Sequence, residues 1–238
     1  MQNSEIFAAV KLGTKEHMTA FYESGEVYMQ TFRYFRQLEL TADGRGDPNE
    51  YDTHYAAGDG LKNIAVTLKV NDAITGELKD EFSLGDGLIG ISMADPSKFR
   101  FSHVFCCSAV DGKEVLKKHR LLDEKNFADG KDWAVLFDAY KFRERLFIAL
   151  RTSKKCARFQ SKAVSYYSEE NFYGDLDCFC KRDAYSYQNE IRFAALFASD
   201  EAQKICIGSL KDIAMPPVCK TDFLNLSFRV ENDRILFK

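Results

Sequence analysis

The sequence predicts an α+β domain built on a mixed, mainly antiparallel sheet with short helices on its flanks. Segments with the composition and period of strands outnumber helical segments, and the two kinds do not alternate regularly along the chain. The 238 residues, 45% of them hydrophobic, suffice for one large domain with a buried core. No internal repeat or low-complexity segment divides them. We therefore expect a single domain over residues 1–238.

The first part of the chain predicts a strand, a helix and a second strand, followed by a long loop. Residues 5–11 (EIFAAVK) have the composition of a strand, and Thr14 is a suitable N-cap for a short helix that ends near Gly25. Residues 26–30 (EVYMQ) predict the second strand. Residues 41–60 are rich in glycine and aspartate and show no apolar period, so we expect a loop there. Because loops of this length are usually functional or mobile, we expect it near the site.

The rest of the chain predicts mostly strands. Residues 139–150 are the clearest helix, because Phe142, Leu146 and Ala149 fall on one face. The expected strands are residues 61–70, 77–84, 88–93, 101–110, 132–137, 157–167, 190–197, 204–208, 226–230 and 234–237. We expect the first two of these to pair as a hairpin, and the last two likewise.

Composition and charge exclude several classes of protein. Lys and Arg number 33 against 36 Asp and Glu, so the net charge of −3 lacks the global basic excess of a dedicated nucleic-acid-binding protein. No apolar run approaches the roughly 20 residues that span a bilayer, and the N-terminal residues lack the pattern of an export signal. The seven cysteines lie in apolar segments rather than in a spaced framework. We therefore expect a cytoplasmic protein with no membrane contact and reduced thiols.

Residues 181–193 (KRDAYSYQNEIRF) are the most informative stretch for function. If they form a strand, Gln188, Glu190 and Arg192 point to one face, and the residues between them point to the other. An amide, a carboxylate and a guanidinium then stand in one row. The alternative is an exposed sheet face on which Glu190 and Arg192 are ordinary surface charges.

Two further kinds of segment are candidates for a site. Asp47 and Glu50 flank Pro48 in the sequence RGDPNE, which predicts a tight turn and is also explained by turn chemistry alone. Basic residues form two clusters, which suit phosphate groups or are simply solvated. The clusters are Lys117, Lys118, His119 and Arg120, and Arg151, Lys154, Lys155, Arg158 and Lys162.

The sequence lacks the common motifs of metal and nucleotide sites. Its four histidines have no HxxxH or HExxH spacing, and its cysteines form no CxxC pair. It contains no GxxxxGK[ST] loop, no GxGxxG after a strand and no GxSxG elbow. We therefore expect no zinc site, and nothing supports a P-loop kinase, a Rossmann enzyme or a serine hydrolase.

Taken together, these segments resemble a large bacterial family of unknown function that is often found beside mobile-element and phage-defence genes. That family has an Asp-Pro-x-Glu turn, a Cys-x-Ser strand, a later tryptophan and the signature Lys-x-x-x-Trp-x-Tyr-Glu-x-Glu-x-Arg. The matching residues are Asp47, Pro48, Glu50, Cys106, Ser108, Trp133, Lys181, Tyr187, Glu190 and Arg192. Tyr185 stands in place of the signature tryptophan, and Gln188 in place of its first glutamate.

The order of elements is also similar to that of ADP-ribosyltransferases. Those enzymes begin with a strand that contacts the nicotinamide nucleotide, a helix ending in glycine and another strand, and they end with a strand bearing Glu or Gln, any residue and Glu. Gln188 and Glu190 match the last motif. The resemblance implies an ADP-ribosyltransferase-like fold, NAD as substrate, and a protein or nucleic-acid acceptor, in a toxin or a phage-defence system. The residues implied in NAD binding are Lys11, Asp47, Glu50, Lys181, Tyr187 and Arg192.

The implied chemistry is coherent. Cleavage of the nicotinamide bond of NAD builds positive charge on the ribose, and a carboxylate held beside the ribose stabilises that charge as it develops. Glu190 has this catalytic role in the hypothesis. Gln188 orients the acceptor, because a neutral amide is not a general base.

Two other functions fit the same residues. One is a metal-dependent nuclease-like enzyme that uses Asp47, Glu50 and Glu190, since carboxylates suit Mg²⁺. The other is a non-enzymatic phage or host interaction protein in which Glu190 and Arg192 form a buried pair. An enzyme requires Glu190 at the floor of a cleft near the first strand. A binding protein requires Glu190 to be paired with Arg192 or Lys181, with no cavity beside it.

Overall fold

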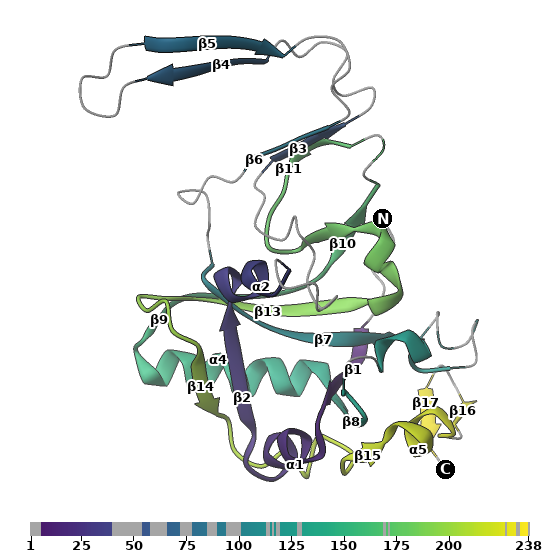
Figure 1. Ribbon diagram of the computed structural model, residues 1–238. Helices are drawn as coiled ribbons and strands as arrows, with labels where there is room; N and C mark the ends of the chain where they lie inside the picture. The colour runs from purple at the N-terminus through teal and green to yellow at the C-terminus, as the bar shows by residue number, and fades with distance from the viewer. Residues whose placement is uncertain are drawn as a thin grey trace.

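The centre of the molecule is an eight-stranded sheet whose strand pairs are antiparallel (Figure 1). Its strands are β1 (Ile6–Gly13), β2 (Glu26–Thr31), β7 (His103–Asp111), β8 (Trp133–Asp138), β9 (Cys156–Ala163), β13 (Glu190–Phe197), β14 (Gln203–Cys206) and β15 (Val218–Cys219). The computed structural model describes residues 6–39, 54–57, 66–71, 78–84, 90–93, 101–112, 115, 117, 120–127, 130–168, 170, 172–226, 228–231 and 234–237. The predicted α+β class with a mainly antiparallel sheet is confirmed.

Strand β7 is shared by two branches of this sheet. One of its edges pairs with β13. Its other edge pairs first with β2, where Thr31 lies opposite His103, and then with β1, where Val10 lies opposite Ser108. Between these two stretches the side chain of Lys11 on β1 donates a hydrogen bond to the backbone carbonyl of Cys106 (2.8 Å). The ammonium group thus binds a β7 carbonyl at the point where β1 and β2 diverge.

The helix between β1 and β2 has the ends that the sequence predicts. Helix α1 (Lys15–Ser24) begins after Thr14, whose hydroxyl accepts a hydrogen bond from the backbone N–H of His17. It ends at Gly25, which has a left-handed φ of 64° and donates to the carbonyls of Ala20 and Phe21. Both caps satisfy backbone groups that a helix end leaves without partners.

Phenylalanines dominate the core on one face of the sheet. Helix α4 (Ala139–Ser153) packs there, and its Phe142 ring lies 4.7 Å from Phe137 and 5.1 Å from Phe193, measured between centroids. Phe21 of α1 joins the same cluster. The opposite face has a smaller cluster in which Phe32 and Phe179 pack near Ala194 of β13. The candidate site lies on this second face.

Smaller elements complete the described part of the chain. They are α2 (Phe32–Glu39), β3 (His54–Ala57), β4 (Val66–Asn71), β5 (Leu78–Leu84), β6 (Gly90–Met93), η3 (Glu124–Asn126), β10 (Ser165–Tyr167), β11 (Tyr173–Asp175), β12 (Cys180–Arg182), η4 (Asp183–Gln188), α5 (Lys220–Leu224), β16 (Phe228–Glu231) and β17 (Arg234–Phe237). Strand β4 pairs antiparallel with β5, and β16 with β17, so both predicted pairings are confirmed. Strands β10 and β12 form a parallel pair.

The prediction of one continuous loop over residues 41–60 is wrong in part. His54–Ala57 form β3, which pairs with β6 and β11 in a three-stranded sheet. The rest of that span lies outside the described residues. The period of a strand this short is too brief to recognise within a segment rich in glycine and aspartate.

Among the helices in the described ranges, none combines the length and the apolar composition that crossing a membrane requires.

Gly25→Ala is expected to lower the free energy of unfolding by at least about 2 kcal/mol. Gly25 has φ 64°, and a Cβ atom there would collide with the backbone carbonyl of Gly208. Gly130→Ala is the matched control, because Gly130 also has a positive φ (74°) but nothing lies within 4 Å of the added Cβ. Urea unfolding of both variants measures the difference. Equal losses would contradict the collision as the cause.

Candidate functional site

The candidate site forms where β13 begins. Residues 183–188 are the 3-10 helix η4 rather than a strand, so the prediction that Gln188 and Glu190 share one strand is wrong. Asn189 separates the two elements with a left-handed φ of 41°. Its side chain donates to the carbonyl of Ala109 (2.8 Å), and its own carbonyl accepts from the N–H of Ala109 (2.6 Å). Asparagine tolerates this conformation better than most residues, so it can end the helix and start the strand here.

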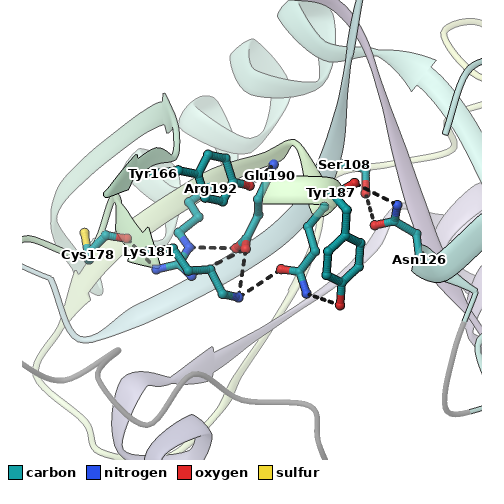
Figure 2. A network of polar contacts seen from close by, with 9 residues as sticks. Ser108, Asn126, Tyr166, Cys178, Lys181, Tyr187, Glu190 and Arg192 are labelled. Atoms are coloured by element: carbon teal, nitrogen blue, oxygen red, sulfur yellow. Dashed lines mark hydrogen bonds and ion pairs between the residues drawn. The ribbon is translucent and has the colours of Figure 1, made fainter. Parts of the chain in front are cut away.

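Glu190 lies in a buried ion-pair network at the first position of β13 (Figure 2). Its Oε1 atom accepts a hydrogen bond from Nε of Arg192 (2.6 Å), and its Oε2 atom accepts from Nζ of Lys181 (3.3 Å). The exposed fractions are 6% for Glu190, 1% for Arg192 and 5% for Lys181. Arg192 also donates to the carbonyl of Cys178 (2.7 Å). The alternative of an exposed sheet face with two surface charges is therefore wrong.

The charges around Glu190 keep its carboxyl group ionised. Burial by itself raises the pKa of Glu190, but the positive charges of Arg192 and Lys181 and the hydrogen bond from Arg192 outweigh burial. The pKa of Glu190 therefore lies well below its usual range. The backbone N–H of Glu190 donates to the hydroxyl of Tyr166 (2.9 Å), and burial raises the pKa of Tyr166 to about 12. That hydroxyl stays protonated at neutral pH.

Gln188 joins this network through Lys181 and not through strand register. The Nζ atom of Lys181 donates to Oε1 of Gln188 (2.9 Å), and Nε2 of Gln188 lies 3.4 Å from the hydroxyl of Tyr187 (Figure 2). The backbone carbonyl of Tyr187 accepts from the side-chain amide of Asn126 (3.1 Å). Four of the predicted site residues around Glu190 thus come together. They are Lys181, Tyr187, Gln188 and Arg192.

Ser108 and Lys11 lie on opposite sides of the sheet. Ser108 is the register partner of Glu190 across β7 and β13, so the two share a face. The ammonium of Lys11 lies 4.3 Å from the ring centroid of Phe105, which belongs to the core under α4. Because neighbouring strand residues alternate between faces, Lys11 is on the other face from Glu190. Asp47 and Glu50 lie outside the described residues.

A cavity of about 230 Å³ borders the network. Tyr166, Ser186, Tyr187 and Asn189 contribute to its lining, and Glu190 does not. Glu190 is therefore next to this space through Tyr166, whose hydroxyl accepts from the backbone N–H of Glu190, without Glu190 itself lining it. Sequence reasoning missed Tyr166 and Asn126, because they reach the site across long sequence separations (24 residues from Tyr166 to Glu190, and 61 from Asn126 to Tyr187). Asn189 had a local signal, since asparagine often ends a helix.

No group of three or more His, Cys, Asp or Glu side chains in the described part of the chain could hold a metal ion. The nuclease-like hypothesis also depends on Asp47 and Glu50. Glu190, the third residue of that hypothesis, is bound on both oxygens by Arg192 and Lys181.

No protein-family model, curated protein or solved structure matches the chain.

Proposed function

We propose that the chain is a non-enzymatic binding protein of phage–host conflict, and that Glu190 has a structural role in it. One observation carries this proposal: both carboxylate oxygens of Glu190 are bound by cations of the protein itself, at an exposed fraction of 6%. A carboxylate that stabilises a ribosyl cation must face the substrate. Here the charges of Arg192 and Lys181 would oppose a positive charge developing beside it. The resemblance to a family found beside phage-defence genes supports the biological setting.

The network has a clear structural task. Lys181 lies on β12, whereas Glu190 and Arg192 lie on β13. The carbonyl of Cys178, which accepts from Arg192, precedes β12 in the chain. The ion pairs therefore hold β12 against the second face of the central sheet. Strand β10 is held there as well, because it pairs with β12. Removing one partner of such a buried network leaves an uncompensated charge.

An ADP-ribosyltransferase-like enzyme that cleaves NAD and modifies a protein or nucleic acid is the second candidate. Its support is the pairing of Ser108 with Glu190 on one face, next to a cavity lined by Tyr166 and Tyr187. The order of β1, α1 and β2 agrees with the resemblance, whereas Gln188 lies on η4 and not on the strand that bears Glu190. In this candidate, NAD must displace Lys181 from the carboxylate before Glu190 can face the ribose.

Nicotinamide release from NAD separates the two candidates. We expect the purified protein to release none above background, with mixed proteins or nucleic acids offered as acceptors. Release by the wild-type chain that Glu190→Gln abolishes at an unchanged melting temperature would overturn the binding proposal. Glu23→Gln is the control variant, since Glu23 forms an exposed ion pair with Lys211 remote in sequence from the site. It should behave as the wild type in both measurements.

A further inference from the structure

We infer that the outer side of α4 is a self-association surface, to which a second copy of this chain binds with its own α4 antiparallel to the first. The surface is a row of five exposed residues, which we call the α4 stripe. It consists of Tyr140, Glu144, Phe147, Ile148 and Arg151. Helix α4 packs on the face of the sheet opposite to Glu190, so the inference does not depend on the role of Glu190.

The spacing of these residues places them in one row along the helix. Residues three or four positions apart are neighbours on a helix surface, and the steps from Tyr140 to Glu144, to Ile148 and to Arg151 all have that length. Phe147 lies beside Ile148 in the same row. The residues of α4 that are buried against the sheet form a separate row on its other side. The α4 stripe is therefore a second, outward-facing row that includes large apolar side chains.

The apolar members of the α4 stripe are largely uncovered. The exposed fractions are 62% for Tyr140, 45% for Phe147 and 61% for Ile148. The ring of Phe147 lies 6.1 Å from that of Phe159, measured between centroids, which widens the apolar surface towards β9. Single exposed apolar residues are ordinary, whereas several large ones gathered within about three helical turns are typical of an interaction site.

The charges of the α4 stripe identify a second copy as its occupant. Glu144 and Arg151 are exposed, and neither takes part in an ion pair with any described residue. They lie two helical turns apart, roughly 10.5 Å along the axis, so they lack the spacing of a contact within one helix. If two copies of α4 cross antiparallel about a two-fold axis between Phe147 and Ile148, Glu144 of each copy lies opposite Arg151 of the other. Two ion pairs then flank an apolar centre.

The same charges oppose a parallel arrangement. A parallel pair of α4 helices would place Glu144 beside Glu144 and Arg151 beside Arg151, and such contacts between like charges are unfavourable. Lys141 borders the α4 stripe, and Asp138 already offsets its charge (3.8 Å). Ion pairs between helices select orientation in this way in coiled coils. The α4 stripe is thus complementary to itself in the antiparallel orientation.

Sedimentation equilibrium of the purified protein between about 1 μM and 1 mM tests the inference. The α4 stripe is smaller than a standard interface, so we expect a weak dimer with a Kd on the order of tens of micromolar. Ile148→Asp should raise this Kd by about tenfold or more, because it places two like charges at the centre of the interface. Ile148 is 61% exposed, so the variant should remain folded, which a melting curve checks.

Charge reversal distinguishes the antiparallel pair from other modes of association. Glu144→Arg and Arg151→Glu should each raise the Kd by about tenfold, because the two-fold axis repeats every new contact between like charges. An equimolar mixture of these two variants should dimerise as the wild type does, since both Glu–Arg contacts form again in the mixed dimer. Glu170→Arg is the matched control and should leave the Kd unchanged. Glu170 is exposed, lies outside α4 and takes part in no ion pair with a described residue.

Four results would overturn the inference. They are a monomer at every concentration, a Kd that Ile148→Asp leaves unchanged, a Kd that neither charge reversal changes, and a mixture of the two reversed variants that associates no better than each alone. None of them bears on the proposed function, because nicotinamide release tests that proposal separately.

Discussion

Glu190→Gln is expected to lower the free energy of unfolding by about 3–5 kcal/mol. The substitution keeps the shape of the side chain but removes its charge. Arg192 and Lys181, exposed by 1% and 5%, then remain buried without the carboxylate that offsets their desolvation. Urea unfolding followed by circular dichroism measures the change. A variant as stable as the wild type would contradict the structural role of Glu190.

Two control variants make this test specific. Replacing Lys181, Glu190 and Arg192 together by methionine should recover most of the lost stability, because an apolar replacement leaves no buried charge. Asp212→Asn removes an exposed ion pair with Arg145 and should have no measurable effect. A triple variant less stable than Glu190→Gln would show that the three side chains stabilise the fold by more than the mutual compensation of their charges.

The same network predicts a loss of stability in acid. The pKa of Glu190 is lower in the folded protein than in the unfolded chain, so the unfolded state binds the proton more readily. The stabilisation is complete above the unfolded pKa of about 4.3. It is lost progressively as the pH falls below that value towards the folded pKa. Glu190→Gln should lack this part of the acid dependence.

Phe142→Ala should lower the free energy of unfolding by about 3–5 kcal/mol. The Phe142 side chain is fully buried, and its ring contacts Phe137 and Phe193 at centroid distances of 4.7 Å and 5.1 Å. Alanine would leave a cavity between α4 and the sheet that the surrounding rings cannot fill without shifting. Thermal and urea unfolding both measure the loss.

Phe147→Ala is the matched control on the same helix. Phe147 is 45% exposed and has one ring neighbour, Phe159, among the described residues. Replacing Phe147 by alanine should lower the free energy of unfolding by less than about 1 kcal/mol. Similar losses for the two variants would contradict the assignment of α4's buried face.

Local chemistry made part of the fold predictable from the sequence. The ends of α1 follow from Thr14 and Gly25, because each cap satisfies backbone groups only a few residues away. The limits of β13 at Glu190 and Phe197 were predicted, because apolar residues dominate this run, although the site prediction extended the strand back to Gln188. These features depend on neighbours along the chain, which the sequence displays directly.

Burial and sheet register were decided only by the tertiary structure. Glu190 is buried because Lys181 of β12 and the hydroxyl of Tyr166 bind it, and the fold places both over the second face of the sheet. Gln188 and Glu190 meet through the side chain of Lys181, although they do not share a strand. Lys11 points away from both, because its face is set by pairing with remote strands. The sequence by itself determined the local elements and the residue types of the network, and long-range packing determined its geometry, since desolvation and pairing depend on segments distant along the chain.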